Sequence, residues 1–135
     1  RECVAAGAEH IDGTGMTSKL WITGGAGGDT LTGGSGVNVY VYGGTSESTP
    51  SAMDIITNFQ TSSDLIDLSA FSTGLTTFAA LSGSSVAAKS VGWLTSGGNT
   101  FVYVNTSSAS ETLTTANMKV ELQGSLTLAR SNFST

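Results

Sequence analysis

A tandem repeat of nine residues constrains this chain more than any other feature of its sequence. The first copy reads Gly-Gly-Ala-Gly-Gly-Asp-Thr-Leu-Thr over residues 24–32, and the second reads Gly-Gly-Ser-Gly-Val-Asn-Val-Tyr-Val over residues 33–41. Each copy begins with a glycine-rich turn and ends with a large apolar residue between β-branched neighbours, a pattern that favours a short strand. One turn followed by one strand, repeated in tandem, predicts a parallel β-helix or β-roll.

The phase of the apolar residues extends the repeat toward the N-terminus. Leu31 and Tyr40 both occupy the eighth position of a copy, and Ile22 lies nine residues before Leu31. We expect these three side chains to point into the roll. Residues 11–23 are therefore expected to form a further, degenerate turn of the roll, with Ile11 also directed inward.

The turns of the repeat have the chemistry of a cation site. Glycine lets backbone carbonyls converge because it has no Cβ, and Asp29 and Asn38, at the sixth positions, add a carboxylate and a carboxamide oxygen. Oxygen ligands at a flexible turn suit Ca²⁺. The candidate backbone ligands are Gly24, Gly25, Ala26 and Gly27 in the first copy and Gly33, Gly34, Ser35 and Gly36 in the second.

A phosphate-binding loop and a flexible linker are the alternative interpretations of so much glycine. The first copy lacks the last glycine of the dinucleotide-binding fingerprint, and no Gly-Lys-Ser/Thr follows to make a P-loop. A strand pattern follows each turn where those loops require a helix. A linker would not keep apolar residues at a fixed phase, so the calcium roll is the favoured interpretation.

The repeat resembles the RTX nonapeptide, the calcium-binding repeat of parallel β-rolls. Residues 53–71 resemble the segment after the roll in the C-terminal domains of serralysin-type metalloproteases and other RTX exoproteins, and residues 122–133 resemble the end of those domains. The resemblance implies that some of the acids after the roll bind calcium, although strand-end and turn acids are an equal alternative. These acids are Asp54, Asp64 and Asp67. Asparagine stands where the family pattern has aspartate at Asn38, Asn58 and Asn132.

The expected fold is all-β, with a short calcium-binding parallel β-roll over residues 1–49 and a β-sandwich-like antiparallel capping sheet within residues 50–135. Residues 53–71 predict two short strands. Alternation of apolar and polar residues predicts strands over 99–105 and 118–122. Between these regions, residues 75–81 permit a short helix and residues 86–93 a connecting strand or turn.

Charge and composition exclude several functional classes. The chain carries ten acidic residues against five Lys and Arg, and it has no basic patch for nucleic acid. The acids concentrate in the half that holds the glycine repeats, where a divalent cation would offset their repulsion. Cys3 is the single cysteine, so no internal disulfide forms, and no apolar run is long enough to span a membrane.

The sequence contains no recognisable catalytic set. His10 is the only histidine, and the zinc-peptidase pattern His-Glu-x-x-His is absent. A serine nucleophile needs a base, and a single histidine among many serines does not indicate one. We therefore expect no enzymatic activity, no catalytic residue and no cofactor besides calcium.

The resemblance implies a function outside the cell. The primary expectation is a non-catalytic calcium-binding module, the C-terminal piece of a longer secreted bacterial protein, which folds on extracellular calcium and is recognised by a type I secretion apparatus. One alternative is a surface-layer or adhesin module that self-associates at the cell surface in calcium. Another is the tail of an exported protease or lipase whose catalytic domain lies upstream.

Overall fold

The computed structural model describes residues 1–4, 7–71 and 74–135, which form β-strands joined by turns, with two short 3-10 helices at Thr45–Glu47 and Arg130–Asn132. The first strands are β1 (Glu2–Val4), β2 (His10–Asp12), β3 (Leu20–Thr23), β4 (Thr30–Thr32), β5 (Asn38–Val41), β6 (Asp54–Ile56) and β7 (Leu65–Asp67). The later strands are β8 (Thr77–Ala80), β9 (Ser85–Val86), β10 (Ser90–Ser96), β11 (Asn99–Asn105), β12 (Glu111–Thr112), β13 (Met118–Leu122) and β14 (Phe133–Ser134).

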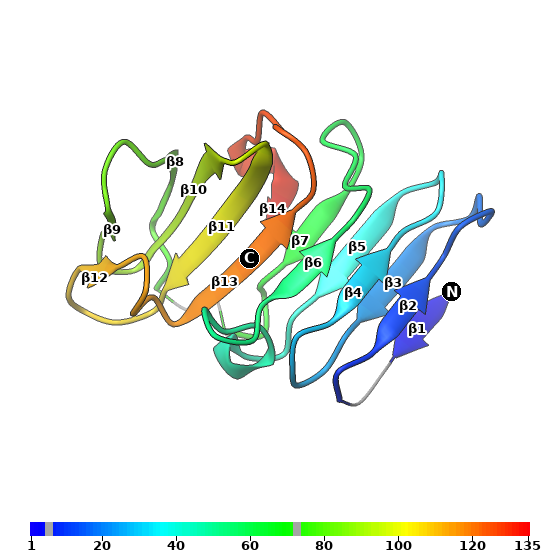
Figure 1. The fold of residues 1–135 in the computed structure, drawn as a ribbon, viewed down its shortest axis with the longest axis horizontal. Coiled ribbons are helices and arrows are strands. Elements are labelled where there is room, and N and C mark those ends of the chain that lie inside the picture. The colour runs from blue at the N-terminus through cyan, green and yellow to red at the C-terminus, as the bar shows by residue number, and fades with distance from the viewer. Residues whose placement is uncertain (5–6, 72–73) are drawn as a thin grey trace.

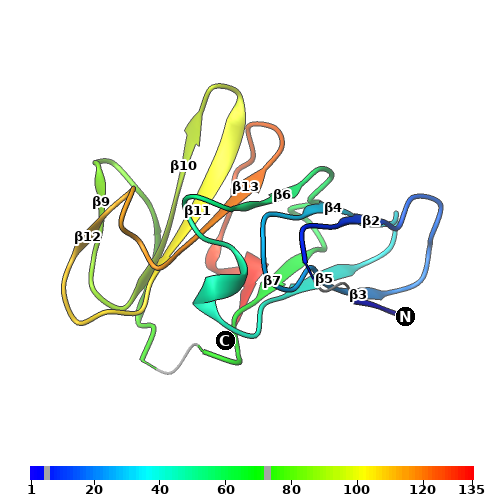
Figure 2. The ribbon, with the colours of Figure 1, turned by 60° about the horizontal axis from the view of Figure 1, so that its bottom comes forward.

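Strands β1 to β7 wind as a roll, because consecutive strands alternate between two sheets (Figure 1). One sheet has the order β1-β3-β5-β7-β14, and the other has the order β2-β4-β6-β13-β11-β10-β8. Figure 2 shows β2, β4 and β6 in one layer and β3, β5 and β7 in the other. Leu20 pairs in parallel with Asn38, and Ile22 with Tyr40, so one coil spans two nine-residue repeats. The predicted β-roll is confirmed.

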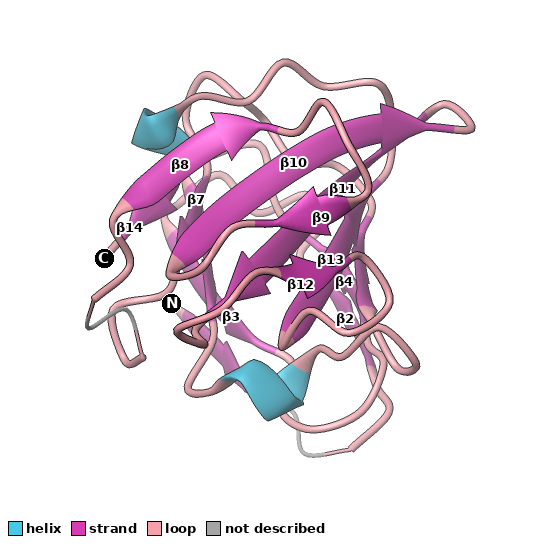
Figure 3. Cartoon of the chain, turned by 90° about the vertical axis from the view of Figure 1, so that its left-hand side faces the viewer, coloured by secondary structure: helices cyan, strands magenta, loops and turns pink. Residues whose placement is uncertain are grey.

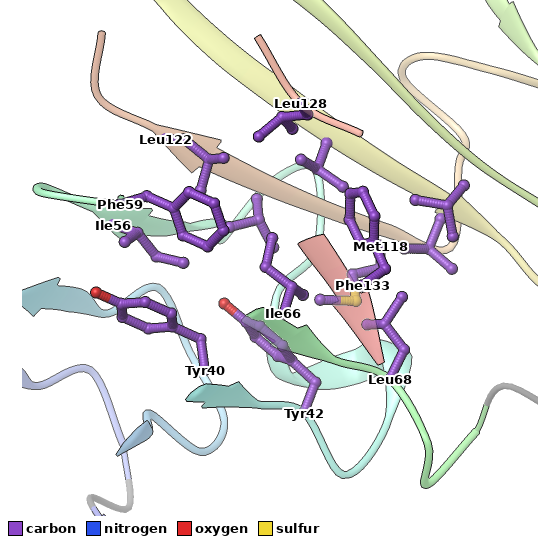
Figure 4. Packing of buried hydrophobic residues seen from close by; sticks show 14 of the residues in the cluster. Tyr40, Tyr42, Ile56, Phe59, Ile66, Leu68, Met118, Leu122, Leu128 and Phe133 are labelled. Carbon is purple, nitrogen blue, oxygen red and sulfur yellow. The ribbon is translucent and has the colours of Figure 1, made fainter. Parts of the chain in front are cut away.

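The interior of the roll is built from the eighth residues of the repeat. Ile22, Leu31 and Tyr40 are each at most 1% exposed, whereas Trp21, one residue before Ile22, is 41% exposed. Successive residues of a strand point to opposite faces, so the repeat phase identifies the inward residues, although Val39, on the outer face of β5, is also buried. Figure 4 shows the continuation of this core between the sheets. It includes Tyr42, Ile56, Phe59, Ile66, Leu68, Met118, Leu122, Leu128 and Phe133.

Strands β6 and β7 are the two strands expected within residues 53–71, and they extend the roll. Thr30 of β4 pairs with Ile55, and Val39 of β5 pairs with Leu65, both in parallel. The expected boundary at residue 49 therefore lies inside two continuous sheets. The polar segment 43–53 is an insertion that lengthens one coil. The composition therefore changes there, but both sheets continue.

The C-terminal strands close the roll. Strands β10, β11 and β13 form an antiparallel sheet, and the predicted strands 99–105 and 118–122 coincide with β11 and β13. Strand β13 then pairs in parallel with β6, and β14 pairs in parallel with β7. The last roll strand of each sheet, β6 or β7, thus pairs with a strand from the last 20 residues. Strands β9 and β12 form a separate small sheet, which faces the viewer in Figure 3.

The helix expected over residues 75–81 is wrong. Residues Thr77–Ala80 form β8, which pairs in parallel with β10, and the Leu81 backbone N–H donates to the Trp93 carbonyl at 2.7 Å. Phe78 packs on Phe133, with 5.8 Å between ring centroids. The free edge of β10 supplies backbone partners that outweigh the local preference of these residues. None of the described helices is long and apolar enough to cross a membrane.

Candidate metal centre

The roll stacks its turns in two columns, one on each side of the molecule. The turn 24–29 joins β3 to β4 and belongs to the first column, and the turn 33–38 joins β4 to β5 and belongs to the second. The backbone N–H of Asp29 donates to the Asp54 carboxylate at 2.9 Å, and the backbone N–H of Asn38 donates to the Asp64 carboxylate at 2.9 Å. Four of the predicted side-chain ligands are therefore brought together as two equivalent pairs, one in each column.

In the first pair, Asp29 and Asp54, each carboxylate has one oxygen without a hydrogen-bond partner among the described residues. Asp29 Oδ1 accepts from the backbone N–H of Glu9 at 2.7 Å, and Asp54 Oδ1 accepts from Asp29. Among the described residues, no donor meets the Oδ2 atom of either acid within hydrogen-bond geometry. The Tyr42 hydroxyl also has no partner at that geometry, but it interacts with Asp54 and lowers its pKa. Both carboxylates are at most 1% exposed. Buried carboxylate oxygens without partners are costly, so a cation or a proton at this position would stabilise the pair.

The environment of the first pair disfavours its negative charge. Burial raises the pKa of Asp29, and the hydrogen bond from Glu9 offsets this only in part. Burial also raises the pKa of Asp54 to about 7, against the lowering effects of the Asp29 N–H and the Tyr42 hydroxyl. The Asp29 charge further raises the pKa of Asp54, and the charges of Glu9 and Glu47 raise the pKa of Asp29, because like charges repel. A cation at this position would reverse the effect by favouring both ionised forms.

The glycines of the first turn leave space for these carboxylates. A Cβ at Gly24 would overlap Asp29 Oδ2, so no larger residue fits there without moving the acid. Gly25 and Gly27 have φ angles of 87° and 109°, in the region that favours glycine. Within residues 1–4, 7–71 and 74–135, no three His, Cys, Asp or Glu side chains gather around one point. The other ligands of a cation would be backbone carbonyls, which suit calcium.

The second pair is satisfied by amides. Asn38 Oδ1 accepts from the Gly34 N–H at 2.9 Å. Asn38 Nδ2 lies between the carbonyl oxygens of Gly34 and Gly36, at 3.1 and 3.0 Å, and the two carboxylate oxygens of Asp64, at 3.1 and 3.2 Å. Gln60 Nε2 donates to the same two carbonyls at 3.0 and 3.3 Å. The two columns therefore differ in chemistry although they share a geometry.

Both columns of turns match one known family. The sequence profile described as "Peptidase M10 serralysin C terminal" matches residues 20–133. The chain belongs to this serralysin C-terminal family. The family is of the RTX calcium-binding type, so the resemblance noted in the nine-residue repeat and in the segments after it is confirmed. No curated protein sequence matches the chain.

Solved structures share the fold of this serralysin C-terminal domain. It is similar to the solution structure of the AlgE6R3 subunit of the Azotobacter vinelandii mannuronan C5-epimerase, at 23% identity and a TM-score of 0.63, over 98% of this chain and 71% of that one. It is also similar to the AlgE6R2 subunit of the same enzyme, at 20% identity and a TM-score of 0.58, over 98% of this chain and 89% of that one. Both likenesses concern the β-roll architecture alone.

The remaining predicted ligands of the serralysin C-terminal domain lie apart from the pairs. Asp67 Oδ1 accepts from the Ser69 backbone N–H at 2.9 Å in the turn after β7, a contact that matches the strand-end interpretation of this acid. Ala26 and Ser35 are exposed at the tips of their turns, and the backbone N–H of Ser35 donates to the Met16 carbonyl at 2.8 Å.

The sequence did not predict that Gln60 and Asn58 contact the turn 33–36. Asn58 Nδ2 donates to the Gly33 carbonyl, and its Oδ1 accepts from the Gly33 N–H, both at 2.8 Å. The partners of these carboxamides lie on the previous coil, more than 20 residues earlier in the chain. The only sequence signal was the departure from aspartate at Asn58, which the repeat itself does not explain.

Proposed function

We propose that this serralysin C-terminal module binds Ca²⁺ at the Asp29–Asp54 pair and that calcium binding stabilises the folded roll outside the cell. The observation that carries the proposal is the pair of buried carboxylate oxygens, Asp29 Oδ2 and Asp54 Oδ2, for which the described residues supply no donor. These two side chains and carbonyls of the turn 24–27 would hold the ion. Calcium would supply the positive charge that the two buried acids require.

Such a site couples calcium to folding. The oxygens of Asp29 and Asp54 come from successive coils and meet only after the coils have stacked, so the unfolded chain has no comparable site. A ligand that binds only the folded state at about 100 times its dissociation constant stabilises that state by about 2.7 kcal/mol. Scarce calcium inside a cell would leave the acidic roll less stable, and millimolar calcium outside would complete its folding.

We infer that the module belongs to an extracellular bacterial protein, is non-catalytic itself and is exported by a type I secretion apparatus. The support is membership of a family named for the C-terminal region of serralysins, together with a net charge of −5 and a single cysteine. A marginally stable roll before export and a calcium-stabilised roll after it would suit passage through such an apparatus.

The test compares the parent chain with Asp29→Asn. We expect calcium to raise the thermal unfolding temperature of the parent relative to chelator, and calorimetry to show binding. Asn at position 29 removes one of the two buried charges, so calcium should no longer shift unfolding. Asp12→Asn is the matched control, because Asp12 is an exposed turn acid that accepts from the Thr14 N–H. Identical unfolding of the parent in calcium and in chelator would overturn the proposal.

A further inference from the structure

We propose that the second column of turns is closed by the Asn38 carboxamide, at the position a cation takes in the first column, and therefore folds without calcium. The inference deepens the proposed function. It rests on that function only for the statement that the first column binds calcium. It divides the roll into a calcium-dependent side and a calcium-independent side.

The two repeats provide an internal comparison. Asp29 and Asn38 occupy the same repeat position, and each donates its backbone N–H to an acid of the next coil at 2.9 Å. In the first column the remaining oxygens of both acids lack a donor among the described residues. In the second column, Asn38 Nδ2 lies 3.0–3.2 Å from four oxygens. Two carbonyls and one carboxylate around a single point are the kinds of ligand that bind calcium, and here an amide nitrogen is at their centre.

The orientation of the Asn38 side chain follows from its contacts. Its other terminal atom lies 2.9 Å from the backbone nitrogen of Gly34, which is a donor. A reversed amide would set a donor against that N–H and an oxygen against four oxygens. Only the orientation with nitrogen toward Asp64 satisfies every group, so asparagine and not aspartate matches this position in the absence of a cation.

Further carboxamides reinforce the second column. The Gln60 side chain reaches the Gly34 and Gly36 carbonyls, and its backbone N–H donates to Asp64 Oδ2 at 3.0 Å. Asn132, in the turn before β14, donates through Nδ2 to the Asp64 carbonyl at 3.3 Å and to the Thr61 carbonyl at 2.8 Å. Asn38, Asn58 and Asn132, the three asparagines at family aspartate positions, thus all lie in this column. At these three positions a neutral carboxamide, which can donate hydrogen bonds, replaces the negatively charged carboxylate that would favour a cation.

The decisive variant is Asn38→Asp, which replaces the central nitrogen with an oxygen. We expect Asn38→Asp to be less stable than the parent in chelator and to bind one additional calcium ion per chain by calorimetry. Asn117→Asp is the matched control. Asn117 Oδ1 only accepts, from the Thr106 N–H at 2.8 Å and the Thr106 hydroxyl at 3.2 Å, so the same change there should add no calcium.

Two results would overturn the inference. One is an Asn38→Asp chain that binds the same amount of calcium as the parent. The other is a parent that loses a calcium ion on Asp64→Asn, which would place an ion in the second column. The second measurement decides the case if Asn38→Asp does not fold, because an unchanged calcium count in Asp64→Asn supports the amide closure.

The outcomes separate this inference from the proposed function. Calcium binding by Asn38→Asp together with none by the parent would sustain the amide closure and reject calcium at Asp29–Asp54. If the parent binds calcium, Asp29→Asn does not, and Asn38→Asp gains no further ion, calcium at Asp29–Asp54 would be sustained and the amide closure rejected.

Discussion

At the scale of single residues, the equivalent positions 29 and 38 of the two repeats differ by one side-chain atom. Asp29 and Asn38 have nearly the same shape, and their turns have the same backbone hydrogen bond to the next coil. The carboxylate leaves buried oxygens that repel one another, whereas the carboxamide nitrogen donates to them. Because a buried polar group contributes mainly through whether it is satisfied, this exchange would make only the first column depend on a cation under the proposed function.

Gly24 allows a prediction at this scale. Gly24→Ala places a Cβ against the Asp29 carboxylate, so we expect the free energy of unfolding to fall by about 1–3 kcal/mol, the usual cost of overpacking. Calcium affinity should fall with it, measured by calorimetry beside chemical denaturation. Gly83→Ala is the control, since no described atom lies within 4 Å of a Cβ there. Equal effects of the two changes would contradict the assigned position of the Asp29 side chain.

At the scale of elements, the strands are short and the turns carry much of the connection between coils. Strands β4 and β6 share only the pairs Thr30 with Ile55 and Leu31 with Ile56. Side-chain contacts between successive turns therefore contribute substantially to each coil's attachment to the next. Loss of those contacts on one side would loosen that side first, because local opening follows the least stabilised contacts.

Hydrogen exchange should show this asymmetry between the columns. In chelator, we expect the backbone amides of Glu9 and Asp29 to exchange much faster than those of Gly34 and Asn38. The acceptors of the first two are the carboxylates of the first column, each of which has one oxygen without a partner among the described residues. Calcium should protect the first two selectively. NMR-detected exchange measures both sets in one sample. Uniform protection in chelator would show that the two columns have equal stability.

At the scale of the whole molecule, the chain closes its own roll. The aromatic ring of Phe133, next to the C-terminal end, stacks on Trp93 at 5.4 Å and contacts Phe78 at 5.8 Å. Through β14 it also pairs with Ile66 of the roll. One buried residue thus joins the roll, the edge strand β8 and the antiparallel sheet. The two regions should unfold as one unit.

Phe133→Ala tests this closure. Removing a buried phenylalanine side chain costs about 3–5 kcal/mol, and Phe133 is 3% exposed. We expect a loss of that size, with the roll and the sheet still unfolding in one transition by circular dichroism and by tryptophan fluorescence. Trp21→Ala removes an aromatic ring from the outer face of β3, where it is 41% exposed, and should cost much less. Two separate transitions in the parent would refute the single unit.

The sequence by itself determined the roll, its inward residues and the strands β11 and β13. Each of these depends on a local periodicity: nine residues per repeat for Ile22, Leu31 and Tyr40, and alternation along residues 99–105 and 118–122. A strand that buries one face has apolar residues at alternate positions of its own sequence, so these elements could be predicted without knowing their distant partners. The calcium-binding class of the repeat was visible for the same reason, since its glycines and Asp29 are contiguous.

Only the tertiary structure decided what each turn residue contacts. Strand β8 forms because it pairs with the free edge of β10. The roll continues past residue 49 because β6 and β7 pair with residues 25 and 26 positions earlier in the chain. Asn38 was expected to contribute an oxygen, but its nitrogen faces Asp64, and Gln60 joins it from the next coil. Hydrogen-bond partners in a roll lie one coil apart, so their pairing depends on how the coils stack and leaves no local pattern in the sequence.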